Sequence, residues 1–329
     1  MSKPILTIGI PTYNRPHNIT RTIHSLLPQL NDKVELLVRD NCSEIPVETL
    51  FTEDEKSKFR IIRTRTNIGG DANICGCIYS ADTKWVWTLG DDSYPLPNAV
   101  ETILSFIEKY PEEVMFCYNS YMQRETHSFI DLAEVNGYRS MFSNFLFIST
   151  SVFNREKLLN YLEYYYKDCT SMVGQTIFVL KYIEDNDGEI FFRSEHVVES
   201  TVDFFQKKVR KSKKEIEGQS WSREVFIRRS SLIFDEFSNK KKFLKKNLFK
   251  GIVQQYLGDI LVHDGMRFKT RIELFRLVGQ KTGYFNILRY NYPTIIQFFI
   301  KAVTPKTLYQ KILSRAKDRE IKNNTKDNV

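Results

Sequence analysis

The sequence predicts an α/β protein with a mostly parallel sheet flanked by helices, followed by a mainly helical C-terminal region. Three observations support this class. Short apolar runs alternate with helix-sized segments over the first hundred residues. Each of these runs ends in a polar, turn-rich loop. From about residue 205 onward glycine becomes rarer, runs of lysine appear and helical periodicity dominates.

The individual elements follow from the spacing of apolar residues. Strand-like runs lie at 5–10, 34–38, 59–63 and 85–89, with further candidates at 114–118, 145–152 and 189–192. Helices are expected at 18–30, 67–80 and 98–110. Strands separated by helices imply βαβ units, and therefore parallel pairing of successive strands.

Charge divides the chain into two parts. Residues 1–204 carry 19 Lys and Arg against 29 Asp and Glu, whereas residues 205–329 carry 29 against 11. We therefore predict an α/β domain over 1–204 and a basic helical accessory region over 205–329.

The composition is that of a soluble globular protein, with 42% hydrophobic and 27% charged residues. The five cysteines form no CxxC pair, so we expect neither a disulfide framework nor a zinc site, and a reducing cytoplasm as the location. No signal peptide is recognisable. The longest apolar stretch, 294–303, contains Gln297 and Lys301 and is too short to span a membrane.

Loops rich in polar residues and glycine follow four of the predicted strands, at the point where each strand ends. They contain Thr12, Tyr13 and Asn14, then Asp40 and Asn41, then Asn67, Gly69 and Gly70, then Asp91 and Asp92. Ligands of open α/β sheets bind beyond the carboxyl ends of the strands. The sequence therefore predicts one binding site at this edge.

Asp91 and Asp92 are adjacent acids at the end of a buried strand. Such carboxylates repel each other unless a cation or a proton intervenes. A hard divalent ion, Mg²⁺ or Mn²⁺, would take one or two of these carboxylates and complete its shell with water and phosphate oxygens. The alternative is that the pair only caps the helix that starts near Pro97.

Four segments resemble family 2 glycosyltransferases, in that family's order and at about its spacing. They are 8–15 (IGIPTYNR), 37–43 (LVRDNCS), 67–73 (NIGGDAN) and 87–93 (WTLGDDS). The resemblance covers roughly residues 5–100. It implies a GT-A-like, Rossmann-related fold in which residues 1–204 form a catalytic domain that binds a nucleotide sugar.

The resemblance also implies roles for matching residues. Pro11, Thr12 and Tyr13 match the loop that lines the nucleoside, and Asp40 matches the acid that hydrogen-bonds the base. Asp91 and Asp92 match the metal-binding motif, here reduced to Gly-Asp-Asp-Ser, with Asp92 the expected direct ligand. Arg65 and Asn67 match the side that faces the phosphates.

The implied reaction is attack by an acceptor hydroxyl on the anomeric carbon, with inversion and loss of the nucleoside diphosphate. The metal would stabilise the developing diphosphate charge, and a carboxylate would take the acceptor proton. No clear equivalent of the family's base is present near 165–180. Asp168 is the candidate and Glu184–Asp185 the second choice, against the alternative that each is a solvated loop acid.

The basic region pairs its positive charge with an aromatic-rich segment at 285–300, flanked by Lys281, Arg289, Lys301 and Lys306. This pattern is typical of a helix lying against an anionic membrane, although a helical bundle with its own core would give the same pattern. The resemblance suggests a glycan or polyprenyl-diphosphate-linked acceptor at the inner membrane face, as in O-antigen or capsule synthesis. No nucleic-acid motif accompanies the charge, so nucleic acid is not expected as a partner.

Two other functions stay open at this point. A nucleotidyltransferase also places paired acids at strand ends, but it would carry a glycine-rich phosphate loop after the first strand, where this chain has Pro11-Thr12-Tyr13-Asn14. The second is a catalytically inactive sugar-nucleotide-binding or scaffold relative, because the base motif is missing.

Overall fold

The structure is a computed structural model that describes residues 3–118, 147–186, 190–199, 223–236, 250–254, 256–258, 260–261, 266–289 and 295–296. The chain divides into two compact units, Met1–Ile252 and Val253–Val329, and each is described by itself. The predicted boundary between residues 204 and 205 lies outside the described residues, so the division by charge stays a prediction.

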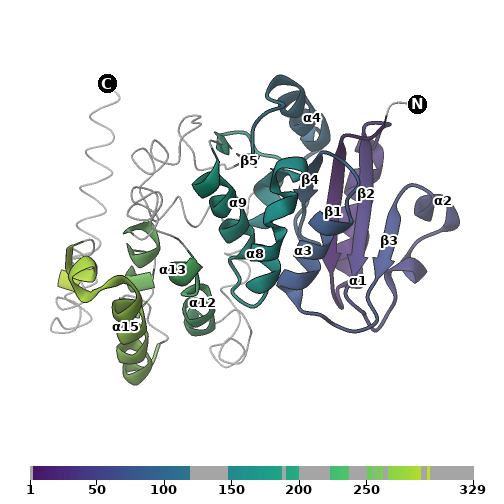
Figure 1. The fold of residues 1–329 in the computed structure, drawn as a ribbon. Coiled ribbons are helices and arrows are strands. Elements are labelled where there is room, and N and C mark those ends of the chain that lie inside the picture. The colour runs from purple at the N-terminus through teal and green to yellow at the C-terminus, as the bar shows by residue number, and fades with distance from the viewer. Residues whose placement is uncertain are drawn as a thin grey trace, which may run out of the picture. The chain divides into compact units, whose positions relative to one another are not determined.

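Unit 1 is built on a seven-stranded sheet with the strand order β3-β2-β1-β4-β6-β5-β7 (Figure 1). The strands are β1 (Leu6–Thr12), β2 (Val34–Asp40), β3 (Arg60–Arg63), β4 (Trp85–Thr88), β5 (Met115–Tyr118), β6 (Ser151–Asn154) and β7 (Ile190–Arg193). β6 pairs antiparallel with β4 and β5, and the other pairings are parallel. The predicted mostly parallel sheet is confirmed.

Helices cover both faces of this sheet. Apolar side chains of α1 (Pro16–Leu26) and α4 (Ala99–Lys109) pack in one core cluster with residues of β1 and β2. Side chains of α3 (Gly70–Ser80), α8 (Leu162–Lys167) and α9 (Gly174–Asp185) fill the cluster on the other face. These three helices lie side by side in front of the sheet in Figure 1. The observed layers are those the sequence predicts.

Shorter helices complete the described part of unit 1. They are α2 (Glu53–Lys56), α7 (Arg155–Leu158), α12 (Arg223–Ser230), α13 (Ile233–Glu236) and the 3-10 helices η1 (Leu27–Gln29), η2 (Val47–Leu50), η3 (Ile148–Thr150) and η4 (Leu159–Tyr161). Most were not predicted, because segments of three or four residues show no periodicity.

Helix α3 lies unusually close to the central strand β1. A Cβ atom added at Gly9 would lie 2.8 Å from the Cβ of Cys77, closer than two carbon atoms can approach. Glycine at this position therefore allows α3 to pack on β1, which places the first turn of α3 beside the carboxyl end of the sheet.

The predicted strand at 145–152 differs most from the structure. Residues 145 and 146 lie outside the described part, and residues 148–150 form η3. The strand itself is β6, which begins six residues after the predicted start. Two carbonyls of η3, those of Ile148 and Ser149, accept hydrogen bonds from side chains at the end of β4, and these tertiary contacts outweigh the local strand propensity.

In the described part of unit 2 the longest helix is α15 (Phe268–Thr282), which ends at Gly283 with φ of +82°. This confirms helix in the C-terminal region. Large apolar side chains of this unit are exposed, among them Phe268 at 70% and Phe285 at 73%. Within the described residues, none of the helices combines the length and the hydrophobicity that crossing a membrane requires.

Candidate active site

The candidate site lies at the carboxyl ends of the parallel strands. β1 and β2 end in register, with Thr12 opposite Asp40, and β4 pairs with the other side of β1. Parallel pairing therefore brings the loops after β1, β2, β3 and β4 to one rim, as expected. Hydrogen bonds join these loops: the amide of Asn41 donates to the carbonyl of Thr12 (3.0 Å), and the Asn41 side chain donates to the side chain of Asn67 (2.9 Å).

The two acids predicted to bind metal share one cationic partner. Nη1 of Arg15 donates to Oδ1 of Asp91 (2.9 Å) and to Oδ2 of Asp92 (3.0 Å). Asp91 is also held by the hydroxyl of Thr12, which donates to its Oδ2 at 2.7 Å. The Asp91 side chain is 7% exposed and the Asp92 side chain 24%, so Asp92 is the more accessible of the pair.

Burial and charge act in opposite directions on these groups. Burial raises the pKa of Asp91, and the positive charge of Arg15 and the hydrogen bond from Thr12 offset part of this rise. Burial alone would lower the pKa of Arg15, but the charges of Asp91 and Asp92 outweigh it and raise the pKa. The arrangement keeps a partly buried guanidinium charged beside two acids.

The pair fits a divalent cation. One oxygen from each carboxylate lies within 3.0 Å of the same nitrogen, so both point at one position that already holds positive charge. Oxygen ligands from one or two carboxylates, with water and phosphate, are what Mg²⁺ and Mn²⁺ take. In the described part of the chain no group of three or more His, Cys, Asp or Glu side chains could hold a metal, so phosphate and water would supply the other ligands.

The segment predicted to line the nucleoside consists of the last two residues of β1, Pro11 and Thr12, and the residue that follows, Tyr13. Pro11 is half-buried and Thr12 is buried, whereas Tyr13 is 43% exposed and free to contact a ligand. Asn14 has a positive φ of 52°, and its side-chain oxygen accepts from the amide of Glu44 (2.8 Å). This bond ties the loop after β1 to the loop after β2.

Asp40 is fully buried at the end of β2. Its Oδ1 accepts from the amide of Ser43 (2.8 Å), and its Oδ2 accepts from the amide of Val47 (3.3 Å) and from the guanidinium of Arg63. Both carboxylate oxygens thus hold the loop after β2 in shape. The contact of Asp40 with a nucleotide base stays a prediction.

Arg65 and Asn67 lie in the loop after β3, and both are exposed. The side-chain oxygen of Asn67 accepts from the amide of Gly69 (2.9 Å) as well as from Asn41. Gly69 has φ of +90°, which an L side chain rarely adopts, and it directly precedes α3. This loop therefore leads from the rim into the first turn of α3.

Asp168 follows α8 and is 5% exposed. Within the described residues its Oδ2 has no hydrogen-bond partner. Burial, and then the charge of Glu236, raise its pKa. Four residues later the amide of Met172 donates to Oδ2 of Asp71 (2.9 Å) in the first turn of α3. The segment that carries Asp168 is therefore joined to the rim through α3.

The second-choice acids, Glu184 and Asp185, lie at the other end of α9. Glu184 is buried and pairs with Lys181 at 3.2 Å, whereas Asp185 is exposed. A rise of 1.5 Å per residue places them about 15 Å along the helix from its start at Gly174. The start of α9 directly follows the segment joined to α3, so these two acids lie away from the rim.

Three residues of the site were missed from the sequence. Arg15 was part of a family segment but received no role, and Arg63 and Ser149 were not singled out. The hydroxyl of Ser149 accepts from the amide of Gly90 (3.0 Å) and shares a hydrogen bond with the hydroxyl of Ser93 (2.7 Å), which holds the turn around Asp91 and Asp92. Ser149 is far from this turn in the chain, so no local pattern could have indicated it.

Backbone strain is concentrated near the same edge. Among the described residues the non-glycine residues with positive φ are Asn14, Cys42 and Met172. Asn14 and Cys42 lie in the loops after β1 and β2, and Met172 contacts the first turn of α3. Such strain often accompanies functional loops and needs surrounding contacts to persist.

Comparison with known proteins agrees with this geometry. Residues 7–152, which run from the second residue of β1 to the second residue of β6 and include the whole rim up to Asp92, match the family model described as "Glycosyl transferase family 2". This domain belongs to glycosyltransferase family 2. The residues predicted from the four sequence segments all fall within the matched part, whereas the last two residues of β6 and the whole of β7 lie beyond it.

A curated relative matches part of the chain. An "Uncharacterized glycosyltransferase" of Haemophilus influenzae is 28% identical over 116 residues, which are 35% of this chain and 38% of that protein. The chain thus spans well under half the length of that relative.

The two structures share the fold at low sequence identity. S. aureus TarS 1-349 in complex with UDP-GlcNAc is 14% identical, with a TM-score of 0.61 over 84% of this chain and 80% of that one. The mannosyltransferase PcManGT from Pyrobaculum calidifontis, in complex with GDP-Man and Mn²⁺, is 12% identical, with a TM-score of 0.53 over 90% and 88%. These matches confirm the GT-A-like fold predicted for the family 2 domain.

Proposed function

We propose that the protein transfers a sugar, with inversion, from a nucleoside-diphosphate donor to a hydroxyl of a glycan or lipid-linked acceptor. One observation carries the proposal: in a family 2 domain, Asp91 and Asp92 converge on one cationic position beside the loops that follow β1 and β2. A divalent metal bound there would neutralise the diphosphate as it leaves. The hydroxyl of Thr12 holds the Asp91 carboxylate in place for this task.

The donor site is tested by binding. Calorimetric titration with UDP, GDP, dTDP and CDP, each with Mn²⁺ and with EDTA, is expected to give metal-dependent binding of one nucleotide. Asp92→Ala is expected to abolish that binding. Asp54→Ala removes an exposed acid on α2, outside the rim, and serves as the matched control. If no nucleotide binds wild type under any condition, the proposed activity is wrong.

Asp168 is proposed as the base that takes the acceptor proton. A buried carboxylate with a raised pKa and an oxygen without a partner in the described part of the chain is suited to accept a proton. Asp168→Asn is expected to lower kcat at least 100-fold while the affinity for the nucleotide stays within a factor of two. If Asp168→Asn keeps its full activity and Glu184→Gln shows this loss of kcat, the base is Glu184 on α9 instead.

Peripheral membrane binding is proposed for the C-terminal region, with the acceptor at the inner face of the cell membrane and a role in O-antigen or capsule synthesis. Phe268, Phe285 and Leu288 are exposed within unit 2, beside the basic residues Lys269 and Arg289. Apolar anchors with flanking positive charge favour an anionic leaflet.

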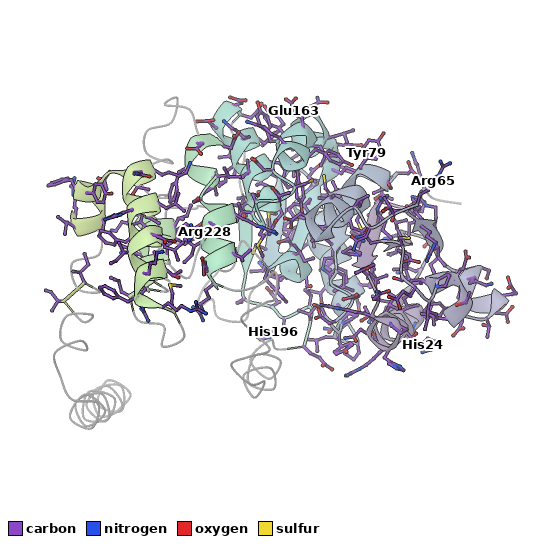
Figure 2. The ribbon with its side chains drawn as sticks, turned by 90° about the horizontal axis from the view of Figure 1, so that it is seen from below. His24, Arg65, Tyr79, Glu163, His196 and Arg228 are labelled. Carbon is purple, nitrogen blue, oxygen red and sulfur yellow. The ribbon has the colours of Figure 1, made fainter. Side chains whose placement is uncertain are left out.

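Sedimentation with vesicles tests this binding. Wild type is expected to bind vesicles containing anionic lipid and to dissociate at high salt, and a Phe285→Ser, Leu288→Ser double variant is expected to lose binding. Tyr79→Ser, which removes an exposed aromatic ring of unit 1, is the control; Figure 2 shows Tyr79 at the same edge as Glu163, with which it lines a surface pocket. Equal binding to neutral vesicles at all salt concentrations would contradict the proposal.

A further inference from the structure

Arg15 lies where a cation is required. It is the residue immediately before α1, and the same nitrogen of its guanidinium contacts both Asp91 and Asp92, at 2.9 and 3.0 Å. The Arg15 side chain is 45% exposed, whereas the two acids are 7% and 24% exposed. The guanidinium therefore approaches the acids from the solvent side of the rim, the side from which a ligand arrives.

The geometry makes Arg15 and a metal ion mutually exclusive at this position. A divalent ion bound to Asp91 Oδ1 and Asp92 Oδ2 would lie about 2.0–2.6 Å from each oxygen. The Arg15 nitrogen now lies about as close to both oxygens as a hydrogen bond allows. Both cations could not share this space, because arginine stays charged at any pH the protein tolerates and like charges repel.

We propose that Arg15 is an internal counter-ion that the metal displaces, and that the displaced guanidinium then binds the donor diphosphate. This inference rests on the proposed function, since it assumes that metal and donor use the Asp91–Asp92 pair. A guanidinium presents a planar fork of donors that matches phosphate oxygens. The half-exposed side chain has room to turn outward from the acids.

The exchange has a thermodynamic consequence. Metal alone must break two charge-assisted contacts of Arg15 and leave the guanidinium without an anionic partner at the rim. Metal that arrives with a diphosphate provides that partner, and the diphosphate also supplies oxygen ligands that the two carboxylates lack. Metal and donor are therefore expected to bind with positive coupling, each raising the affinity for the other by the same factor.

The experiment compares Arg15→Gln with wild type and with Arg21→Gln. Arg21 is the matched control, because it is an exposed arginine in α1, six residues after Arg15, that stacks on Tyr94 and pairs with Glu199 at 3.8 Å. Mn²⁺ alone is titrated, and free Mn²⁺ is followed by electron paramagnetic resonance. Arg15→Gln is expected to bind Mn²⁺ at least five-fold more tightly than wild type, and Arg21→Gln as wild type does. The Tm gained from added Mn²⁺ is expected to be larger in Arg15→Gln than in wild type.

A second titration measures the coupling, using whichever of UDP, GDP, dTDP or CDP binds wild type. The factor by which this nucleotide tightens Mn²⁺ binding is expected to fall in Arg15→Gln. Arg15→Lys, which keeps a positive charge, is expected to bind Mn²⁺ alone as weakly as wild type and guards against loss of fold in the first variant. Unchanged or weaker Mn²⁺ binding by a folded Arg15→Gln overturns the inference.

The outcomes separate this inference from the proposed function. If wild type binds a nucleotide with metal and Arg15→Gln gains no Mn²⁺ affinity, the counter-ion role is wrong and the transferase proposal stands. If wild type binds no nucleotide but Arg15→Gln gains Mn²⁺ affinity, the displacement by metal stands, and both the transferase proposal and the diphosphate contact of Arg15 are wrong.

Discussion

Replacing Asp40 by asparagine tests how the loop after β2 is held. The Asp40 carboxylate is fully buried, and each of its oxygens accepts from a donor: the Ser43 amide on one side, and the Val47 amide and Arg63 on the other. Asparagine has the same shape but offers one oxygen and one NH₂ group. In either orientation the NH₂ group therefore faces a donor, and Arg63 loses its anionic partner.

The size of the effect follows from the same contacts. Removing one partner of a buried ion pair costs about 3–5 kcal/mol. The Arg63 side chain is 32% exposed, so water compensates part of this loss. We expect Asp40→Asn to lower the free energy of unfolding by about 2–4 kcal/mol, a large part of the roughly 5–15 kcal/mol typical of a domain.

Urea unfolding followed by tryptophan fluorescence measures this change, because Trp85 and Trp87 are both buried on β4. Arg63→Met and the double variant complete a cycle that isolates the pair energy. The double variant is expected to be less destabilised than the sum of the two single variants. A loss below about 1 kcal/mol in Asp40→Asn, with the slope against urea unchanged, would refute the view that Asp40 anchors the loop.

Three further predictions concern the sheet, pH and the acid pair. Gly9→Ala should destabilise the protein by about 1–3 kcal/mol in urea unfolding, because the new Cβ meets Cys77, whereas Gly70→Ala, with no atom within 4 Å, should change little. Burial raises the pKa of Asp71 to about 6, so the folded state binds this proton more tightly than the unfolded state does. The free energy of unfolding should therefore fall by at most about 3 kcal/mol as pH rises from 3.8 to about 6. Measured at pH 4.5 and at pH 7, this fall should be smaller in Asp71→Asn than in wild type. Thr12→Val leaves buried Asp91 without its 2.7 Å hydrogen bond and should cost about 1–3 kcal/mol of stability, measured in the same assay.

Much of the first hundred residues could be predicted from the sequence because the signals there are local. Each of the strands β1 to β4 is a short apolar run that stops at a polar loop, and the structure places the observed ends within one or two residues of the predicted ones. Parallel pairing then fixes which loops share the rim. The position of Asp40, Asn67 and Asp91 at one edge followed from that rule alone.

The rest depends on contacts between distant segments. The antiparallel direction of β6 is set by pairing with β4 and β5, and its true start is shifted by the bonds of η3. The contact of Arg15 with Asp91 spans 76 positions of the chain, so no spacing rule reveals it. Asp168 lacks a family motif. Only its burial, and an oxygen that has no partner among the residues the structure describes, distinguish it from a solvated acid.

The left-handed backbone at Cys42 has a consequence for how this protein would respond to laboratory evolution. A non-glycine residue in that region costs roughly 1–2 kcal/mol, which glycine avoids. In a laboratory selection for thermal stability alone, Cys42→Gly should therefore be among the first substitutions to appear. Selection that also demands activity would meet a conflict, because glycine loosens the loop whose shape Asp40 fixes. The protein's present melting temperature would then be a compromise with the rigidity of this loop.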